Sequence, residues 1–302
     1  MPIHLPPISR RRFLKTTLAA GAALLVPGRT DAAQQPVDAN RFALLADVHV
    51  WANRDEPFNK VKPADNLQKV CREILALAPR PANMIVAGDC AQIKGMPGDY
   101  AVLKNVLNTV RRAGIAVHLC LGNHDHRANF YAAFPDARPS GSPPVRGKHA
   151  AILQSSHANF VLLDSLETTN VTPGLLGEAQ LGWLARVLDA HKDKPALAFA
   201  HHDPNFGKRK SGLRDTDALL KLFQARRHVA AYVYGHTHAW GHKKAGDLHL
   251  VNVPTTAWLF NKKQPRGWVD ARLRAGGAKL VLNALDKKHA AHGEQIDLKW
   301  RA

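Results

Sequence analysis

Several patterns that would narrow the class of this protein are absent from its 302 residues. There are three cysteines, Cys71, Cys90 and Cys120, without paired spacing, which argues against a disulfide framework. Buried free thiols are the simplest interpretation, with one disulfide among the three left open. No glycine-rich phosphate loop of the Walker type occurs, so ATP chemistry of that kind is unsupported. Internal repeats and low-complexity tracts are also missing.

Long apolar runs are missing as well. The apolar stretch near the N-terminus, residues 18–26, is interrupted by Gly21 and is too short to span a bilayer comfortably. It follows Ser9-Arg10-Arg11-Arg12-Phe13-Leu14-Lys15 and precedes Pro27 and small residues up to Ala33. This arrangement resembles a twin-arginine signal peptide with its cleavage region; the alternative is a chance basic patch before a buried helix. We expect residues 1–33 to engage the twin-arginine export machinery. The mature protein would then be periplasmic or secreted, with no transmembrane segment.

Acidic residues are few relative to basic ones. Lysine and arginine number 42 against 24 aspartates and glutamates, a formal net charge of +18. This surplus favours an anionic partner such as a phosphate ester, a nucleic acid or an anionic surface, without choosing among them. Because no recognisable nucleic-acid motif accompanies the charge, a nucleic acid is disfavoured as a specific partner. The oligomeric state is left open.

Apolar runs of strand length alternate with helical patterns over residues 38–285, which predicts one α/β domain. In its first half the order strand, helix, strand, helix, strand implies a parallel sheet whose carboxyl ends share one edge. A hairpin is expected over residues 268–282, and an irregular loop near the site over residues 127–147. The polar and basic residues 286–302 are expected to form a mobile C-terminal tail.

Five of the apolar runs end in residues that can bind a metal. In chain order these ends are Asp47-Val48-His49, Gly88-Asp89, Gly122-Asn123-His124-Asp125, His201-His202 and Gly235-His236-Thr237-His238. In open α/β sheets, ligands bind beyond the carboxyl ends of the strands. Carboxylate, amide and imidazole donors that converge there can hold a divalent ion. Each motif alone is weak, since Gly-Asn is also ordinary turn chemistry. The ordered set of five is far more specific.

This set, which runs from Asp47 to His238, resembles the calcineurin-like metallophosphoesterase superfamily. Within it, the pattern is closest to the cyclic-nucleotide and glycerophosphodiester phosphodiesterases. The resemblance implies a four-layer α/β/β/α sandwich with a dinuclear metal site of Mn, Fe or Zn at the carboxyl ends of the strands. It implies that one metal is held by Asp47, His49 and His238, the other by Asn123, His201 and His236, and both by Asp89.

The resemblance also implies that His124 faces the substrate and stabilises or protonates the leaving oxygen, while Asp125 holds its ring. Asp203 stands where related sequences commonly have a proline two residues after the histidine matched by His201. His202 is therefore an alternative ligand, although we prefer His201, the first residue after the strand. Gln92 stands where purple acid phosphatases carry a tyrosine, which disfavours a purple Fe(III) site.

The reaction implied is hydrolysis of a small anionic phosphate ester by a metal-bridging hydroxide that attacks phosphorus in line. The sequence favours a phosphodiesterase. The alternative on the same dinuclear site is a nucleotidase-like phosphomonoesterase. A polyanion-binding protein and a catalytically silent metal scaffold rank lower, the latter because His124 and Asp125 are both present. Trp51, Tyr234 and Trp240 are candidates for stacking a base, with packing an equally good interpretation.

Overall fold

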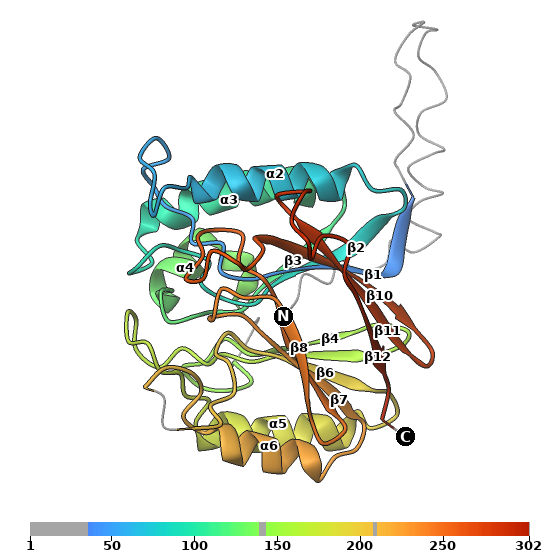
Figure 1. Ribbon diagram of the computed structural model, residues 1–302. Helices are drawn as coiled ribbons and strands as arrows, with labels where there is room; N and C mark the ends of the chain where they lie inside the picture. The colour runs from blue at the N-terminus through green and yellow to red at the C-terminus, as the bar shows by residue number, and fades with distance from the viewer. Residues whose placement is uncertain (1–35, 139–142, 208–209, 302) are drawn as a thin grey trace, which may run out of the picture.

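The computed structural model of the protein describes residues 36–138, 143–207 and 210–301. The signal peptide expected at residues 1–33 lies outside them. In the described part of the chain, two six-stranded sheets face each other between two pairs of helices (Figure 1). The four-layer α/β/β/α sandwich expected from the sequence is therefore confirmed. Within the same ranges, every helix is too short or too polar to cross a membrane.

The first sheet has the order β12-β11-β10-β1-β2-β3. Its strands are β1 (Val37–Leu45), β2 (Arg80–Val86), β3 (Ala116–Leu119), β10 (Gly267–Arg274), β11 (Gly277–Ala284) and β12 (Gln295–Lys299). The strands β1, β2 and β3 are parallel, and β10 pairs antiparallel with β1. Two connecting helices, α2 (Pro63–Leu75) and α3 (Pro97–Arg112), cover its outer face (Figure 1). The carboxyl ends of β1, β2 and β3 thus open on one edge, as predicted.

The second sheet has the order β4-β5-β6-β7-β9-β8. Its strands are β4 (Ala151–Gln154), β5 (Asn159–Leu162), β6 (Ala196–Phe199), β7 (Val229–Tyr234), β8 (Gly241–Ala245) and β9 (Leu248–Asn252). The four central strands β5, β6, β7 and β9 are parallel. The helices α5 (Glu178–Ala190) and α6 (Thr216–Gln224) cover its outer face (Figure 1).

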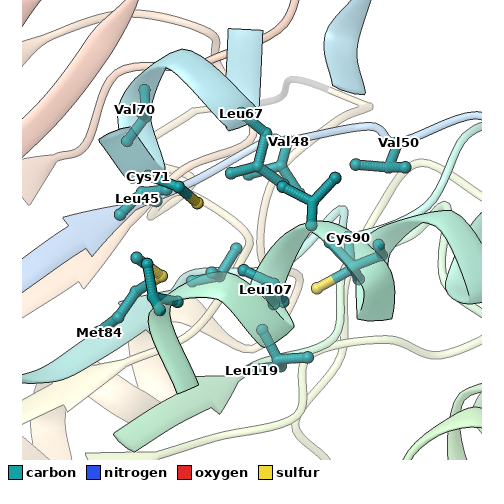
Figure 2. Packing of buried hydrophobic residues seen from close by; sticks show 14 of the residues in the cluster. Leu45, Val48, Val50, Leu67, Val70, Cys71, Met84, Cys90, Leu107 and Leu119 are labelled. Carbon is teal, nitrogen blue, oxygen red and sulfur yellow. The ribbon is translucent and has the colours of Figure 1, made fainter. Parts of the chain in front are cut away.

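Three buried apolar clusters fill the spaces between the four layers. Alternate residues of β1 divide between two of them, because successive side chains of a strand point to opposite faces. Leu45 packs towards α2 and α3 with Leu67 and Met84 (Figure 2). Phe42 instead faces the second sheet, where its ring stacks on Phe160 with centroids 4.3 Å apart. The two sheets are therefore held face to face by a continuous core.

Three parts of the fold differ from the sequence-based expectation. The described part of the expected C-terminal tail, residues 286–301, is not a separate mobile segment: Ile296 and Leu298 alternate with polar residues and are buried, so β12 completes the first sheet. Residues 127–147 are not wholly irregular, because they include α4 (Arg127–Ala133) and a 3₁₀ turn (Pro135–Ala137). The strand β8 was not expected, since its sequence Gly-His-Lys-Lys-Ala lacks apolar alternation. All three cysteines are free and buried, the simplest interpretation of the sequence.

Candidate metal centre

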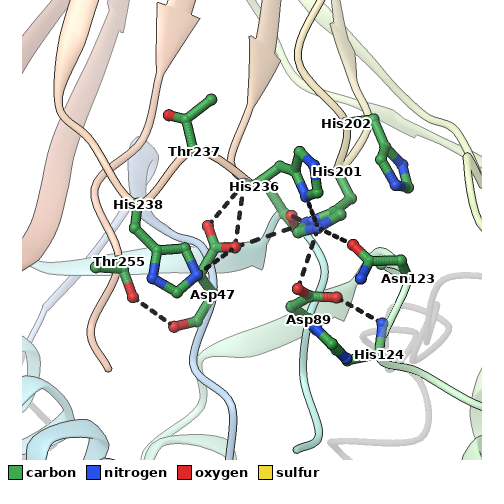
Figure 3. A network of polar contacts seen from close by, with 12 residues as sticks. Asp47, Asp89, Asn123, His124, His201, His202, His236, Thr237, His238 and Thr255 are labelled. Carbon is green, nitrogen blue, oxygen red and sulfur yellow. Dashed lines mark hydrogen bonds and ion pairs between the residues drawn. The ribbon is translucent and has the colours of Figure 1, made fainter. Parts of the chain in front are cut away.

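The loops that follow five parallel strands bring seven candidate ligands together, and Figure 3 labels all of them except His49. Four come from the first sheet, with Asp47 and His49 after β1, Asp89 after β2 and Asn123 after β3. Three come from the second sheet, with His201 after β6 and His236 and His238 after β7. Six of the seven are at most 2% exposed, and His236 is partly exposed. Buried polar groups this numerous require partners of opposite charge or hydrogen-bonding character.

Asp47, His49 and His238 form the first group. The Nε2 atoms of His49 and His238 are 3.0 Å apart, and Nε2 of His238 is 3.4 Å from Oδ1 of Asp47. Nδ1 of His238 donates a hydrogen bond of 2.7 Å to the Trp258 carbonyl. This bond turns Nε2 towards the site, as in metal-binding histidines whose other ring nitrogen donates to a carbonyl.

His201, His236 and Asn123 form the second group. Nδ1 of His201 donates to the carbonyl of Ala87 at 3.0 Å, so its Nε2 faces the site. That Nε2 atom lies 3.1 Å from Nδ1 of His236 and 3.2 Å from Oδ1 of Asn123. The second group therefore presents two imidazole nitrogens and an amide oxygen to one point.

Asp89 lies between the two groups. Its Oδ2 is 3.5 Å from Nε2 of His49 and 3.2 Å from Nε2 of His201. Its Oδ1 accepts a hydrogen bond of 2.9 Å from the backbone N–H of His124. One carboxylate oxygen thus faces both groups, as a ligand that bridges two ions would have to do.

The electrostatics of the site suit a cation. Burial lowers the pKa of His49 to about 3 and that of His236 to about 3, so both imidazoles are neutral. Burial opposes ionisation of Asp89, yet the neighbouring His201 holds its pKa well below the usual range. Burial likewise disfavours a charged His201, but Asp89 and Asp47 raise its pKa to about 9. The carboxylates thus favour a positive charge beside them, which His201 carries as a proton, and the neutral imidazoles of His49 and His236 are ready donors; together they suit a divalent metal.

The backbone at these positions is unusual. Asp47, His49, Asp89, His236 and His238 all have positive φ angles, from 41° to 68°. Such left-handed conformations are uncommon in residues other than glycine and concentrate at functional sites. The tight turns they form direct successive donors of one motif inward.

The glycines of the motifs allow the turns to approach one another. A Cβ atom on Gly122 would lie 2.2 Å from Oδ1 of Asp89, and one on Gly235 would lie 2.4 Å from Oδ2 of Asp47. On Gly88 it would lie 2.5 Å from Cβ of His201. These glycines are required because another residue's backbone or side chain occupies the space of a side chain.

His202 is the alternative ligand that the sequence left open. Its nitrogens lie near those of His201 and His236, close enough to form a third potential ligand group. However, its Nδ1 is 2.7 Å from Oγ of Ser165 and its Nε2 is 2.8 Å from the Thr172 carbonyl. Both nitrogens are thus already engaged, and the geometry favours His201.

His124 lies at the site as expected, but Asp125 does not hold its ring. Nδ1 of His124 donates a hydrogen bond of 2.9 Å to the carbonyl of Ile93, a β-branched residue with φ of 47°. The Asp125 carboxylate is fully buried and accepts four other hydrogen bonds, from the backbone N–H groups of Cys90, Ala91 and Gly122 and from the Tyr100 hydroxyl. The expected His124–Asp125 pair is therefore wrong. Asp125 instead ties the loops after β2 and β3 together.

A cavity of about 430 Å³ opens above the site. It is lined by candidate site residues and, beyond them, by Thr172, Asp203, Ser211, Thr237, Trp258 and Phe260. Trp51, Tyr234 and Trp240, the aromatic residues selected from the sequence, do not line it, and neither do the described residues of 127–147. Sequence analysis missed Trp258 and Phe260 because the loop after β9 carries no metal-binding motif.

Comparison with known proteins agrees with the fold and the motifs. The chain matches the Calcineurin-like phosphoesterase family over residues 40–240, so it belongs to that family. Family membership makes it a phosphoric ester hydrolase and supports bound metal ions. Residues 7–27 match the twin-arginine translocation signal, which indicates export to the periplasm or beyond.

Individual relatives are distant. A 3′,5′-cyclic-nucleotide phosphodiesterase of Nostoc sp. is 24% identical over 74% of this chain and 80% of its own length. A 3′,5′-cyclic adenosine monophosphate phosphodiesterase of Pseudomonas aeruginosa is 27% identical over 72% of this chain and 76% of its own. A dimetal phosphatase of Danio rerio has a TM-score of 0.65 at 18% identity, covering 87% of this chain and 99% of that one. At that identity the structural match shows a shared fold and no more.

Proposed function

We propose that the exported protein is a phosphodiesterase with a dinuclear metal site. Asp47, His49 and His238 would hold one ion, Asn123, His201 and His236 the other, and Asp89 both. The observation that carries this proposal is the position of the Asp89 carboxylate, with one oxygen facing the imidazoles of both groups. Two adjacent cations held there would neutralise the charge of the ester and would lower the pKa of a water molecule that serves as the nucleophile.

His124 acts on the substrate side of this centre. It lines the cavity, and its Nδ1–H is fixed on the Ile93 carbonyl. Its Nε2 is therefore the nitrogen left to meet the substrate, where it can hydrogen-bond the leaving oxygen and donate a proton to it. A carbonyl partner on Nδ1 is compatible with both the neutral and the protonated ring, since Nδ1 carries a proton in each.

The proposed substrate class follows from the named relatives and from the export signal. Both of the bacterial relatives described above are named for cyclic-nucleotide hydrolysis, which favours a diester. A cytoplasmic messenger would not reach an exported enzyme, so scavenging of extracellular nucleotides or other phosphodiesters fits better. The cavity of about 430 Å³ has room for an ester group beyond the phosphate itself.

The test is hydrolysis of bis-p-nitrophenyl phosphate compared with p-nitrophenyl phosphate, each with Mn²⁺, Zn²⁺ or a chelator. We expect metal-dependent turnover that favours the diester and falls by about 10²-fold or more in His124→Ala. His157→Ala, at the turn between β4 and β5, is the matched control and should keep full activity. A preference for the monoester would replace the proposal with a phosphomonoesterase. If both esters are still hydrolysed at the same rate in the presence of the chelator, a metal-dependent mechanism is refuted.

A further inference from the structure

Phe260 is the most exposed of the large apolar side chains in the described part of the chain, at 70%. A single exposed apolar residue is ordinary on a protein surface. Phe206, for example, is 65% exposed and does not line the cavity above the candidate metal centre. Phe260 differs because it does line that cavity.

The position of Phe260 relative to the centre is defined by one ring contact. Its ring is stacked on the imidazole of His238, with centroids 4.3 Å apart and an interplanar angle of 27°. Nε2 of that imidazole is 3.4 Å from the Asp47 carboxylate (Figure 3). One face of the phenyl ring is therefore against a candidate ligand, and the other face is left to the cavity or the solvent.

The loop that carries Phe260 is anchored on both sides of it. The carbonyl of Trp258 accepts the hydrogen bond from His238, and Oε1 of Gln264 accepts one of 2.9 Å from the backbone N–H of Trp240. The indole of Trp258 packs against the imidazole of His49, with the two ring centroids 4.1 Å apart. An exposed aromatic ring on an anchored loop is preorganised for binding, because little conformational freedom is left to lose.

The surroundings of the ring suit an aromatic ligand that also carries polar groups. Lys262 and Lys263 are exposed in the same loop, two and three residues beyond Phe260. Thr172 and Ser211 line the cavity, and a hydroxyl group is able to hydrogen-bond a polar linker such as a sugar. A glycerol or alkyl ester would use the hydroxyls but would gain nothing from the free face of the ring.

We propose that Phe260 is a specificity-determining residue that stacks on a nucleobase or another planar ring of the phosphate ester. This rests on the proposed function, since it takes the phosphate to bind at the metal centre. Stacking of a base on an aromatic side chain is sequence-tolerant, because every base has a π-face. The site would then accept nucleotide esters of different bases and discriminate against esters without a ring.

The experiment measures binding by calorimetry in the presence of Mn²⁺, with 5′-AMP and glycerol 3-phosphate as probes. Both are phosphate monoesters, and only the first carries a ring. We expect the wild-type protein to prefer 5′-AMP. Phe260→Ala and Phe260→Leu should each reduce that preference by about ten-fold or more, and Phe260→Tyr should retain it. Affinity for glycerol 3-phosphate should change less than two-fold in all three variants, and Phe206→Ala should change neither affinity.

Two outcomes would overturn the proposal. Equal affinity of the wild-type protein for both probes would mean that no ring is recognised. Equal weakening of both probes in Phe260→Ala, with rescue by Phe260→Leu, would mean that Phe260 merely covers His238. The proposed function fails separately, since it requires turnover of a diester, whereas this test reads binding of two monoesters that need not be hydrolysed.

Discussion

Replacement of Gly122 by alanine tests the architecture of the site with a single added methyl group. The Cβ atom would lie 2.2 Å from Oδ1 and 2.5 Å from the backbone nitrogen of Asp89, and 2.8 Å from Cδ2 of His201. Real Cβ atoms essentially never approach closer than 3.0 Å, so Asp89 and the loop at residue 122 must move apart by at least about 0.8 Å. A displacement of about 1 Å can cost on the order of 10²-fold in rate.

We therefore expect Gly122→Ala to lower kcat/KM for bis-p-nitrophenyl phosphate by about 10²-fold and to weaken Mn²⁺ binding measured by calorimetry. Gly241→Ala is the matched control, because no atom lies within 4 Å of its added methyl group. Thermal unfolding should show that both variants remain folded. Wild-type activity and wild-type Mn²⁺ affinity in Gly122→Ala would refute the inference that Asp89 must stay where it is.

Three further predictions concern stability. Asp125→Asn should lower the free energy of unfolding by about 2–3 kcal/mol in urea titrations, because the NH₂ group of the asparagine would face backbone N–H donors. An unchanged urea midpoint would contradict the hydrogen bonds described for Asp125. Arg41→Met should lower the free energy of unfolding by about 3–5 kcal/mol in the same titrations, because Arg41 forms a buried bidentate ion pair with Asp270. The double variant with Asp270→Leu should recover much of this loss. Additive losses in the double variant would rule out the ion pair as the cause. Burial lowers the pKa of His249 from 6.5 to about 4, so the folded state binds fewer protons than the unfolded state between these values, and stability should fall as the pH falls from 6.5 to 4. His249→Gln should flatten that dependence, and a slope equal to that of the wild type would show that another group is responsible.

The sequence predicted that candidate ligands lie at the strand ends because they leave local patterns, and the four layers were implied by the family that these patterns resemble. Apolar runs that end in Asp-x-His or Gly-His-x-His are visible in a few consecutive residues, and parallel strands bring such ends to one edge. The contacts of Asp125 leave no such pattern, since three of its four donors are 25 to 35 residues away in the chain. The expectation that Asp125 holds its neighbour His124 failed for this reason.

The role of β12 and of Phe260 depended on tertiary packing in the same way. Ile296 and Leu298 are too few to outweigh the basic residues around them, and only the edge of β11 explains why they are buried. Phe260 is placed at the site by its contact with the imidazole of His238, 22 residues earlier in the chain, and this contact is not visible in the sequence. His202 shows the converse case, because its sequence position suits a ligand but its contacts with Ser165 and Thr172 occupy both nitrogens.

The division of the seven proposed ligands between the two sheets has a mechanical consequence. Four belong to loops of the first sheet and three to loops of the second, so ions bound among them would fasten the two halves of the sandwich together at one end. The bound ions would act as a cross-link between the two sheets that chelation removes reversibly. The protein should unfold more slowly and resist proteases longer with metal than without it. In an exported protein, which works beyond the reach of cytoplasmic chaperones, the catalytic ions would then also determine how long the molecule survives.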